Sequence, residues 1–65
     1  MNELMIVLKS GGWMYFKTEE KTADKALTKF EETCDNAGIN IDNLEINLVK
    51  LRSEENVDID ELKIF

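Results

Sequence analysis

Residues 22–38, TADKALTKFEETCDNAG, decide the fold of this 65-residue chain. Apolar side chains recur there at intervals of three and four residues, the spacing of one face of a helix. They are Ala23, Ala26, Leu27, Phe30, Cys34 and Ala37. Thr18 or Thr22 is suited to cap the start of such a helix, and Gly38 is suited to the C′ position after its end. We therefore expect one amphipathic helix that ends at Gly38 and packs its apolar stripe on another element.

Two apolar runs precede the helix, over residues 3–9 and 13–18, and the glycine-rich stretch between them predicts a β-hairpin. The length of the loop decides which residues share a face of the sheet. A two-residue loop mixes apolar residues on both faces. A three-residue loop over 10–12 pairs Leu8 with Met14 and sorts the apolar residues better, so we favour it.

Two further runs follow the helix. Residues 43–51 predict a third strand, and residues 57–65 predict a fourth whose alternation slips around Asp60-Glu61, as at a β-bulge. The element order is therefore ββαββ in a single domain, 1–65. A helical crossover places the third strand beside the first. We predict an α+β fold, with a four-stranded antiparallel sheet of order 2-1-3-4 and one helix packed on one face.

A single helix shields only one face of such a sheet, and the predicted uncovered face is also apolar. In the third strand we expect Leu44, Ile46 and Leu48 to lie under the helix. The residues expected on the uncovered face, and so in an apolar interface, are Met5, Val7, Trp13, Tyr15, Val49 and Leu51. Exposed apolar patches mark interfaces, and Trp and Tyr are enriched in them. Three interpretations stay open: a different register or a twisted sheet that buries these residues, a homodimer, or another protein partner.

Charge is segregated along the chain. Residues 1–30 carry five lysines and four acidic residues, a net of +1, whereas residues 31–65 carry ten acidic and three basic residues, a net of −7, which together give the total of −6. The predicted acidic interface comprises Glu31, Glu32, Asp35, Asp42, Glu45, Glu54, Glu55, Asp58, Asp60 and Glu61. The first three oppose the dipole at the end of the helix, so helix stability does not explain them. Three interpretations remain: a solubilising surface, a surface that competes for a basic site on another protein as phosphates do, and a loose cation site.

The residue types that most catalytic sites need are missing. The chain has no histidine, and its one cysteine, Cys34, lies on the apolar stripe of the helix. Its glycine pair lacks the lysine and Ser/Thr of a phosphate-binding loop. An EF-hand aligned on Gly38 would place residues without carboxylates at three of four ligand positions. We therefore expect no enzyme activity, no metal site and no cofactor.

The longest apolar run is too short to span a bilayer, so we expect a cytoplasmic protein without a membrane partner. We predict a non-enzymatic acidic binding protein that occupies a basic surface of a protein partner, as an inhibitor or a nucleic-acid-mimicking decoy. We also expect it to form a homodimer. In size, acidity and lack of catalytic groups it is similar to the small inhibitory or decoy proteins of phages and mobile elements.

Two alternatives to this function remain. One is a structural homo-oligomer whose acidic surface is only solubilising. The other is single-stranded nucleic-acid binding through Trp13 and Tyr15, which lie beside Lys9 and Lys17 in the predicted sheet. The net charge of −6 disfavours the second alternative because such binding depends on phosphate neutralisation, so we expect no direct nucleic-acid partner.

Overall fold

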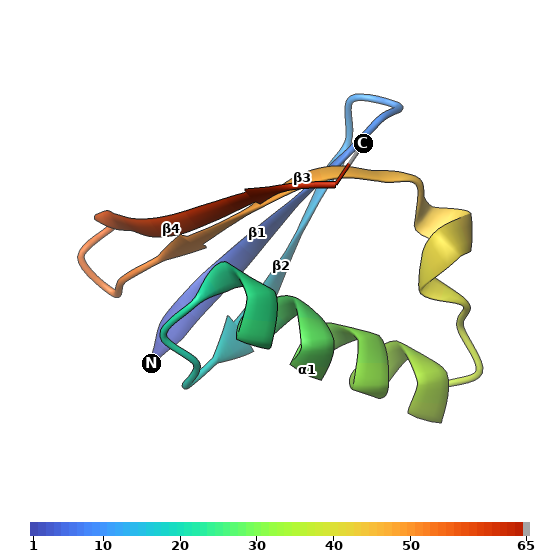
Figure 1. The fold of residues 1–65 in the computed structure, drawn as a ribbon, viewed down its shortest axis with the longest axis horizontal. Helices are drawn as coiled ribbons and strands as arrows, with labels where there is room; N and C mark the ends of the chain where they lie inside the picture. Colours follow the sequence, from blue (N-terminus) through green and yellow to red (C-terminus); the bar gives the residue numbers. More distant parts are fainter. Residues whose placement is uncertain (65) are drawn as a thin grey trace.

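The predicted α+β fold is confirmed by a computed structural model, which describes residues 1–64. The elements in chain order are β1 (Asn2–Leu8), β2 (Trp13–Thr18), α1 (Ala23–Asn36), the 3-10 helix η1 (Ile41–Leu44), β3 (Ile46–Arg52) and β4 (Asp58–Lys63). The four strands form one antiparallel sheet of order β2-β1-β3-β4. Helix α1 packs on one face of this sheet (Figure 1).

The β1–β2 hairpin has a three-residue loop, as predicted, but it lies one residue earlier, over residues 9–11. The Leu8 N–H donates to the Gly12 carbonyl at 2.8 Å, and Gly11, with φ +98°, takes the left-handed conformation that ends such loops. Ile6, not Leu8, therefore pairs with Met14. Because the register differs from the expected one by two residues, every side chain stays on its expected face.

Helix α1 begins and ends as its sequence predicts. The side chain of Thr22 accepts a hydrogen bond from the Lys25 N–H at 3.3 Å, which identifies Thr22 as the N-cap. Gly38, with φ +78°, follows the helix, and the Ile39 N–H donates back to the Cys34 carbonyl at 2.8 Å, the pattern of a Schellman motif. Ala37 is exposed, so the buried stripe ends at Cys34.

The core lies between α1 and the covered face of the sheet. Its buried residues are Leu4, Ile6, Ala23, Ala26, Phe30, Cys34, Ile46, Val49 and Leu51. Phe30 of the helix meets Phe16 of β2 edge to face, with ring centroids 5.4 Å apart. The helix therefore packs across the centre of the sheet.

The expected orientation of the third strand is wrong. Val49 and Leu51 were expected on the uncovered face, but they are fully buried beneath α1 and pair with Ile6 and Leu4. The reason is a register shift in β3, where Leu48 pairs with Val7 but Ile46 pairs with Leu8, so that Asn47 is extra. This bulge lets Ile46 and Val49 face the same side, and it turns Leu48 to the uncovered face.

The segments around β3 also differ from their predicted bounds. Residues 43 and 44 belong to η1, which the sequence did not reveal, and Glu45 leaves this short helix with φ +53°. The fourth strand covers residues 58–63, and its irregularity lies at Ile59, between the residues that pair with Leu51 and Arg52. The predicted end of that strand, Phe65, lies outside the described residues.

Candidate protein-binding sites

The face of the sheet opposite α1, which we call the open face, presents three rows of side chains across the four strands. In the order β2, β1, β3, β4 the rows are Trp13-Val7-Leu48-Lys63, Tyr15-Met5-Lys50-Glu61 and Lys17-Glu3-Arg52-Asp58. The apolar members gather at one corner, around Trp13 and Tyr15. These two aromatic side chains are 60% and 52% exposed. Met5, Val7, Trp13 and Tyr15 are therefore brought together as predicted, and Leu48 takes the place expected for Val49 and Leu51.

The opposite end of the open face is charged, with alternating signs. Lys17 Nζ lies 3.6 Å from Glu3 Oε2, and Arg52 Nε lies 3.0 Å from Asp58 Oδ1. In the middle row, Lys50 Nζ lies 3.7 Å from Glu61 Oε1. These cross-strand pairs balance most of the charge on this face.

The ten acidic residues predicted as one interface are divided among four parts of the structure. Asp58 and Glu61 form the ion pairs of the open face, while Asp60 lies on the covered face, where its Oδ2 accepts a hydrogen bond from the Ala23 N–H at 2.8 Å. Glu54 and Glu55 lie in the turn between β3 and β4. The other five belong to neighbouring parts of the chain: Glu31, Glu32 and Asp35 lie in the second half of α1, and Asp42 and Glu45 lie in or next to η1. Figure 1 shows η1 and the C-terminal end of α1 on the same side of the molecule, which we call the acidic end.

Glu54 contacts the N-terminal amine of Met1. Their hydrogen bond is the main cause that raises the pKa of the amine and lowers the pKa of the Glu54 carboxyl. Both groups are exposed to solvent. Glu54 therefore serves as a local partner of the chain terminus.

In the part of the chain that the structure describes, most carboxylates at the acidic end of the molecule have no ion pair, although Lys9 lies close by, its backbone N–H donating to the Glu45 carbonyl at 2.8 Å. Glu32 lies 3.8 Å from Lys29, but among residues 1–64 no basic group lies within ion-pair distance of Glu31, Asp35, Asp42 or Glu45. The last turn of α1 contains no basic residue. The negative end of the helix dipole adds to these carboxylates.

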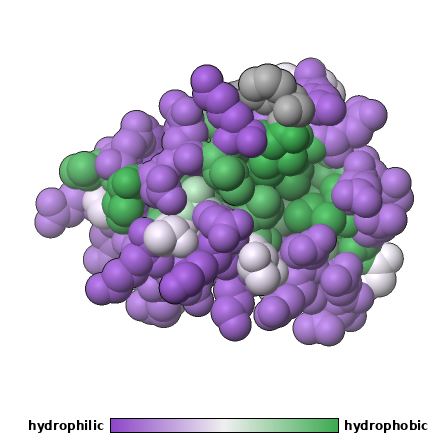
Figure 2. Space-filling model, in the orientation of Figure 1, coloured by the Kyte–Doolittle hydropathy of each residue, from purple (hydrophilic) through white to green (hydrophobic). Residues whose placement is uncertain are grey.

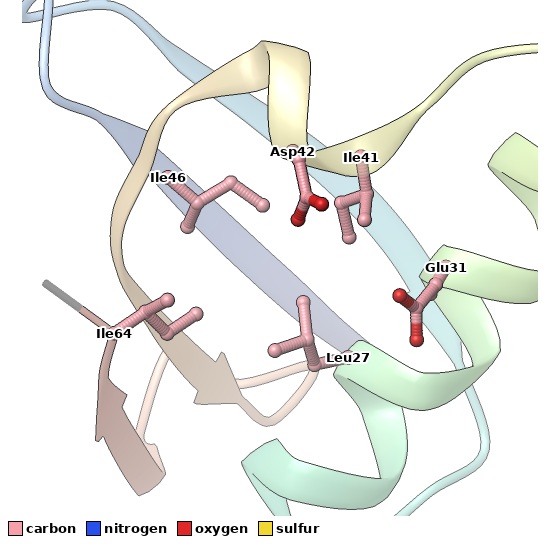
Figure 3. Close-up of a pocket in the computed structure, with 6 residues that line it drawn as sticks. All are labelled: Leu27, Glu31, Ile41, Asp42, Ile46 and Ile64. Atoms are coloured by element: carbon pink, nitrogen blue, oxygen red, sulfur yellow. The ribbon is translucent and has the colours of Figure 1, made fainter.

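A groove opens at this acidic end, between α1, η1, β3 and the residue after β4. We call it the acidic groove. It has a volume of about 230 Å³ and is lined by Leu27, Glu31, Ile41, Asp42, Ile46 and Ile64. Figure 2 shows apolar surface in the middle of this side of the molecule, between the helix and the strands. In Figure 3 the six side chains surround one space, with the carboxylates of Glu31 and Asp42 beside its apolar walls.

Sequence reasoning missed the acidic groove. It identified Glu31 and Asp42 as interface residues but not the isoleucines near them. Ile41 and Ile64 lie in segments without a regular apolar period, so no pattern linked them to Leu27. The available signal was the presence of the large apolar residues Ile39, Ile41 and Leu44 in the connection between α1 and β3.

Cys34 is buried in the core, and within residues 1–64 no group of three or more His, Cys, Asp or Glu side chains is placed to hold a metal ion. In the same part of the chain, no helix combines the length and apolar content that crossing a membrane requires.

Comparisons with protein-family models, with curated proteins and with solved structures found no match.

Proposed function

We propose that this protein is a non-enzymatic binding protein that uses its acidic groove to occupy a basic surface of a protein partner. One observation carries the proposal: carboxylates from two different elements, Glu31 of α1 and Asp42 of η1, flank one apolar depression. The matching ligand is an apolar side chain with lysines or arginines on either side. The apolar walls would hold the side chain and the carboxylates would pair with its neighbours.

The electrostatics of the acidic end support a basic partner. An exposed carboxylate in the last turn of a helix, such as that of Asp35, costs about 0.3–1 kcal/mol in helix stability, and the cost falls for carboxylates farther from the end, such as that of Glu31. Glu31 and Asp35 have no ion pair among the described residues to offset that cost. A field of one sign at the mouth of an apolar site attracts oppositely charged molecules and speeds their association. Binding, and not folding, therefore accounts best for this concentration of charge.

The arrangement of carboxylates favours a groove over a phosphate-like row. The ten acidic residues lie in α1, its connection to β3, the β3–β4 turn and β4, and several are engaged within the chain. An inhibitor of a nucleic-acid-binding protein remains one form of the proposal, because such proteins present basic surfaces. In that form we expect the groove, and not a regular line of charges, to make the specific contact.

The charges on the open face argue against the nucleic-acid alternative. Trp13 and Tyr15 are exposed as a stacking platform requires. However, Lys17, Lys50 and Arg52 each pair with a carboxylate of the same face. Of the four cations on this face, three are thus engaged and Lys63 is left to neutralise phosphates, on which the affinity of such sites depends.

The proposal is tested with a synthetic peptide that carries one leucine between lysines, measured by calorimetry at low salt. Glu31→Lys should weaken binding about tenfold, because it reverses a charge at the groove. The matched control is Glu55→Lys, which makes the same change of charge in the exposed β3–β4 turn and should weaken binding less than about threefold.

Three further arms complete the test. A peptide with glutamates in place of the lysines should not bind, and rising salt should weaken the lysine peptide. Leu27→Ser should reduce affinity without changing the charge. Equal losses for Glu31→Lys and Glu55→Lys would mean that only the overall charge attracts the peptide. That result would leave the structural homo-oligomer with a solubilising surface as the better account.

A further inference from the structure

The apolar corner of the open face, formed by Met5, Val7, Trp13, Tyr15 and Leu48, is a contiguous set of exposed and partly exposed apolar side chains. Val7 pairs with both Trp13 and Leu48, and Met5 pairs with Tyr15, so the five side chains are direct neighbours across three strands. Trp13 and Tyr15 are each more than half exposed. We infer that a second copy of this chain covers this corner, and that the open face is the interface of a homodimer.

The charge of the open face identifies a second copy as the occupant. The face carries the cations Lys17, Lys50, Arg52 and Lys63 and the anions Glu3, Asp58 and Glu61, a net of +1. The chain totals −6, so the rest of it carries −7. An identical, strongly acidic chain is repelled by the rest of the surface but not by this face.

The ion pairs on the open face also fit a self-complementary interface. The pairs Lys17–Glu3, Arg52–Asp58 and Lys50–Glu61 are complete within one chain. The face therefore does not require a partner of opposite charge. A two-fold axis brings the same surface from each copy together, which places apolar corner against apolar corner.

The size of the face predicts a weak, reversible dimer. Four strands spaced about 4.8 Å apart, with about seven residues each, give a flat footprint of roughly 450 Å². Side chains enlarge that footprint, so two such faces would bury on the order of 1,000 Å² in total, near the lower limit of specific interfaces. We expect a dissociation constant in the micromolar range.

Sedimentation equilibrium tests the inference, over chain concentrations from about 1 µM to about 1 mM. The parent chain should pass from monomer to dimer across this range. Trp13→Glu should stay monomeric while its helical circular dichroism is unchanged. The matched control is Val57→Glu, which adds the same charge at an exposed apolar residue of the β3–β4 turn and should dimerise as the parent does.

A second variant separates packing of the open face from pairing of strand edges. Trp13 lies on β2, an edge strand whose backbone is also open to another chain. Met5 lies on β1, which has a hydrogen-bonded strand on both sides. Met5→Lys should therefore abolish the dimer only if the faces pack together.

The response to salt distinguishes the two proposed surfaces. Added salt should strengthen the dimer, because it screens repulsion between two chains of −6, whereas it should weaken binding of the lysine peptide to the acidic groove. Glu31→Lys should leave the dimer intact. Failure of either proposal is therefore visible without failure of the other.

Several results would overturn the inference. They are a chain that stays monomeric throughout, dimerisation of Trp13→Glu, unfolding of Trp13→Glu, dimerisation of Met5→Lys, and dissociation of the dimer as salt rises. Binding of a single-stranded oligonucleotide by a monomer whose Trp13 fluorescence is quenched would assign the open face to nucleic acid instead.

Discussion

The two faces of the sheet are made by alternate residues of the same strands, yet only one of them is a core. Leu4 and Ile6 of β1 are fully buried, whereas Met5 and Val7, which alternate with them along the strand, remain partly exposed. Both faces are apolar where β1 and β2 approach the hairpin, so apolar character alone does not separate them. The difference is that α1 covers one face, while the other ends in a row of cross-strand ion pairs.

Shortening neighbouring side chains of β1 should show the largest difference in stability between the two faces. Leu4→Ala should lower the free energy of unfolding by about 2–5 kcal/mol, because it opens a cavity in the core. Met5→Ala should cost about 1 kcal/mol or less, because Met5 contacts no covering element in the monomer. Urea unfolding at low micromolar concentration measures both variants.

The contrast is large relative to the whole stability of a small domain. A 65-residue chain is expected to have a free energy of unfolding of about 3–10 kcal/mol. Leu4→Ala therefore removes a large share of it. Equal losses in the two variants would show that the open face is packed as a core in the single chain, and both the open-face description and the dimer inference would fail.

A smaller difference in stability is expected between substitutions of Asp58 and Asp60, which lie two residues apart in β4 but on opposite faces of the sheet. Asp60→Ala removes the acceptor for the Ala23 N–H in the first turn of α1 and should cost about 1–2 kcal/mol. Asp58→Ala removes only an exposed ion pair with Arg52 and should cost less than about 0.5 kcal/mol. Thermal unfolding of the two variants gives the comparison, and a larger loss in Asp58→Ala would contradict it.

The smallest expected effect belongs to a contact outside both faces, between the Met1 amine and Glu54. The raised pKa of the amine adds stability that is present below pH 8.0 and is lost as pH rises through the raised value. The lowered pKa of Glu54 adds stability that is present above pH 4.5 and is lost as pH falls through the lowered value. The contact therefore contributes its full stability only between pH 4.5 and pH 8.0.

Thermal melts from acidic to alkaline pH measure this contribution as the difference between the chain and its N-acetylated form. Acetylation removes the charge of the amine, so the difference should be small and confined to that window. Glu54→Gln should give the same profile. A difference that persists well above the raised pKa of the amine would show that acetylation acts on packing instead.

Much of the fold could be predicted because several signals agree. Thr22, the apolar stripe and Gly38 each place α1 independently, and the crossover rule then fixes the strand order. In the hairpin, the predicted pairing was partly wrong, yet the side chains of β1 and β2 were assigned to the correct faces of the sheet. Its loop lies one residue from the expected place, which moves the pairing by two residues and preserves the alternation.

The third strand could not be oriented from its sequence. Leu44, Ile46 and Leu48 alternate as a strand should, but Val49 and Leu51 are apolar on the other parity. With apolar residues on both sides, the pattern does not choose between the faces. The choice is made by pairing with β1, where the extra residue Asn47 turns Val49 and Leu51 under the helix.

The candidate sites were predictable to different degrees. Four of the five residues of the apolar corner follow from alternation in β1 and β2, which the sequence shows directly, whereas Leu48 joins them because of the bulge in β3. The acidic groove depends on η1, a 3-10 helix of four residues that ends at Glu45 in a left-handed conformation. No apolar period marks such a segment, and a glutamate is not the usual residue at its end. The position of Ile41 in the same groove as Leu27 and Ile64 therefore follows only from the fold.

The hydrogen bond from Ala23 to Asp60 has a consequence for the newly made chain. Its donor and acceptor are 37 residues apart, and the acceptor lies in β4, which follows the other three strands along the chain. While the nascent chain is shorter than this, the amide at the head of the helix lacks that acceptor and the outer strand of the sheet is missing. Native structure in this protein is therefore completed only after synthesis has passed Asp60, and folding intermediates on the ribosome should show the helix fraying from its first turn.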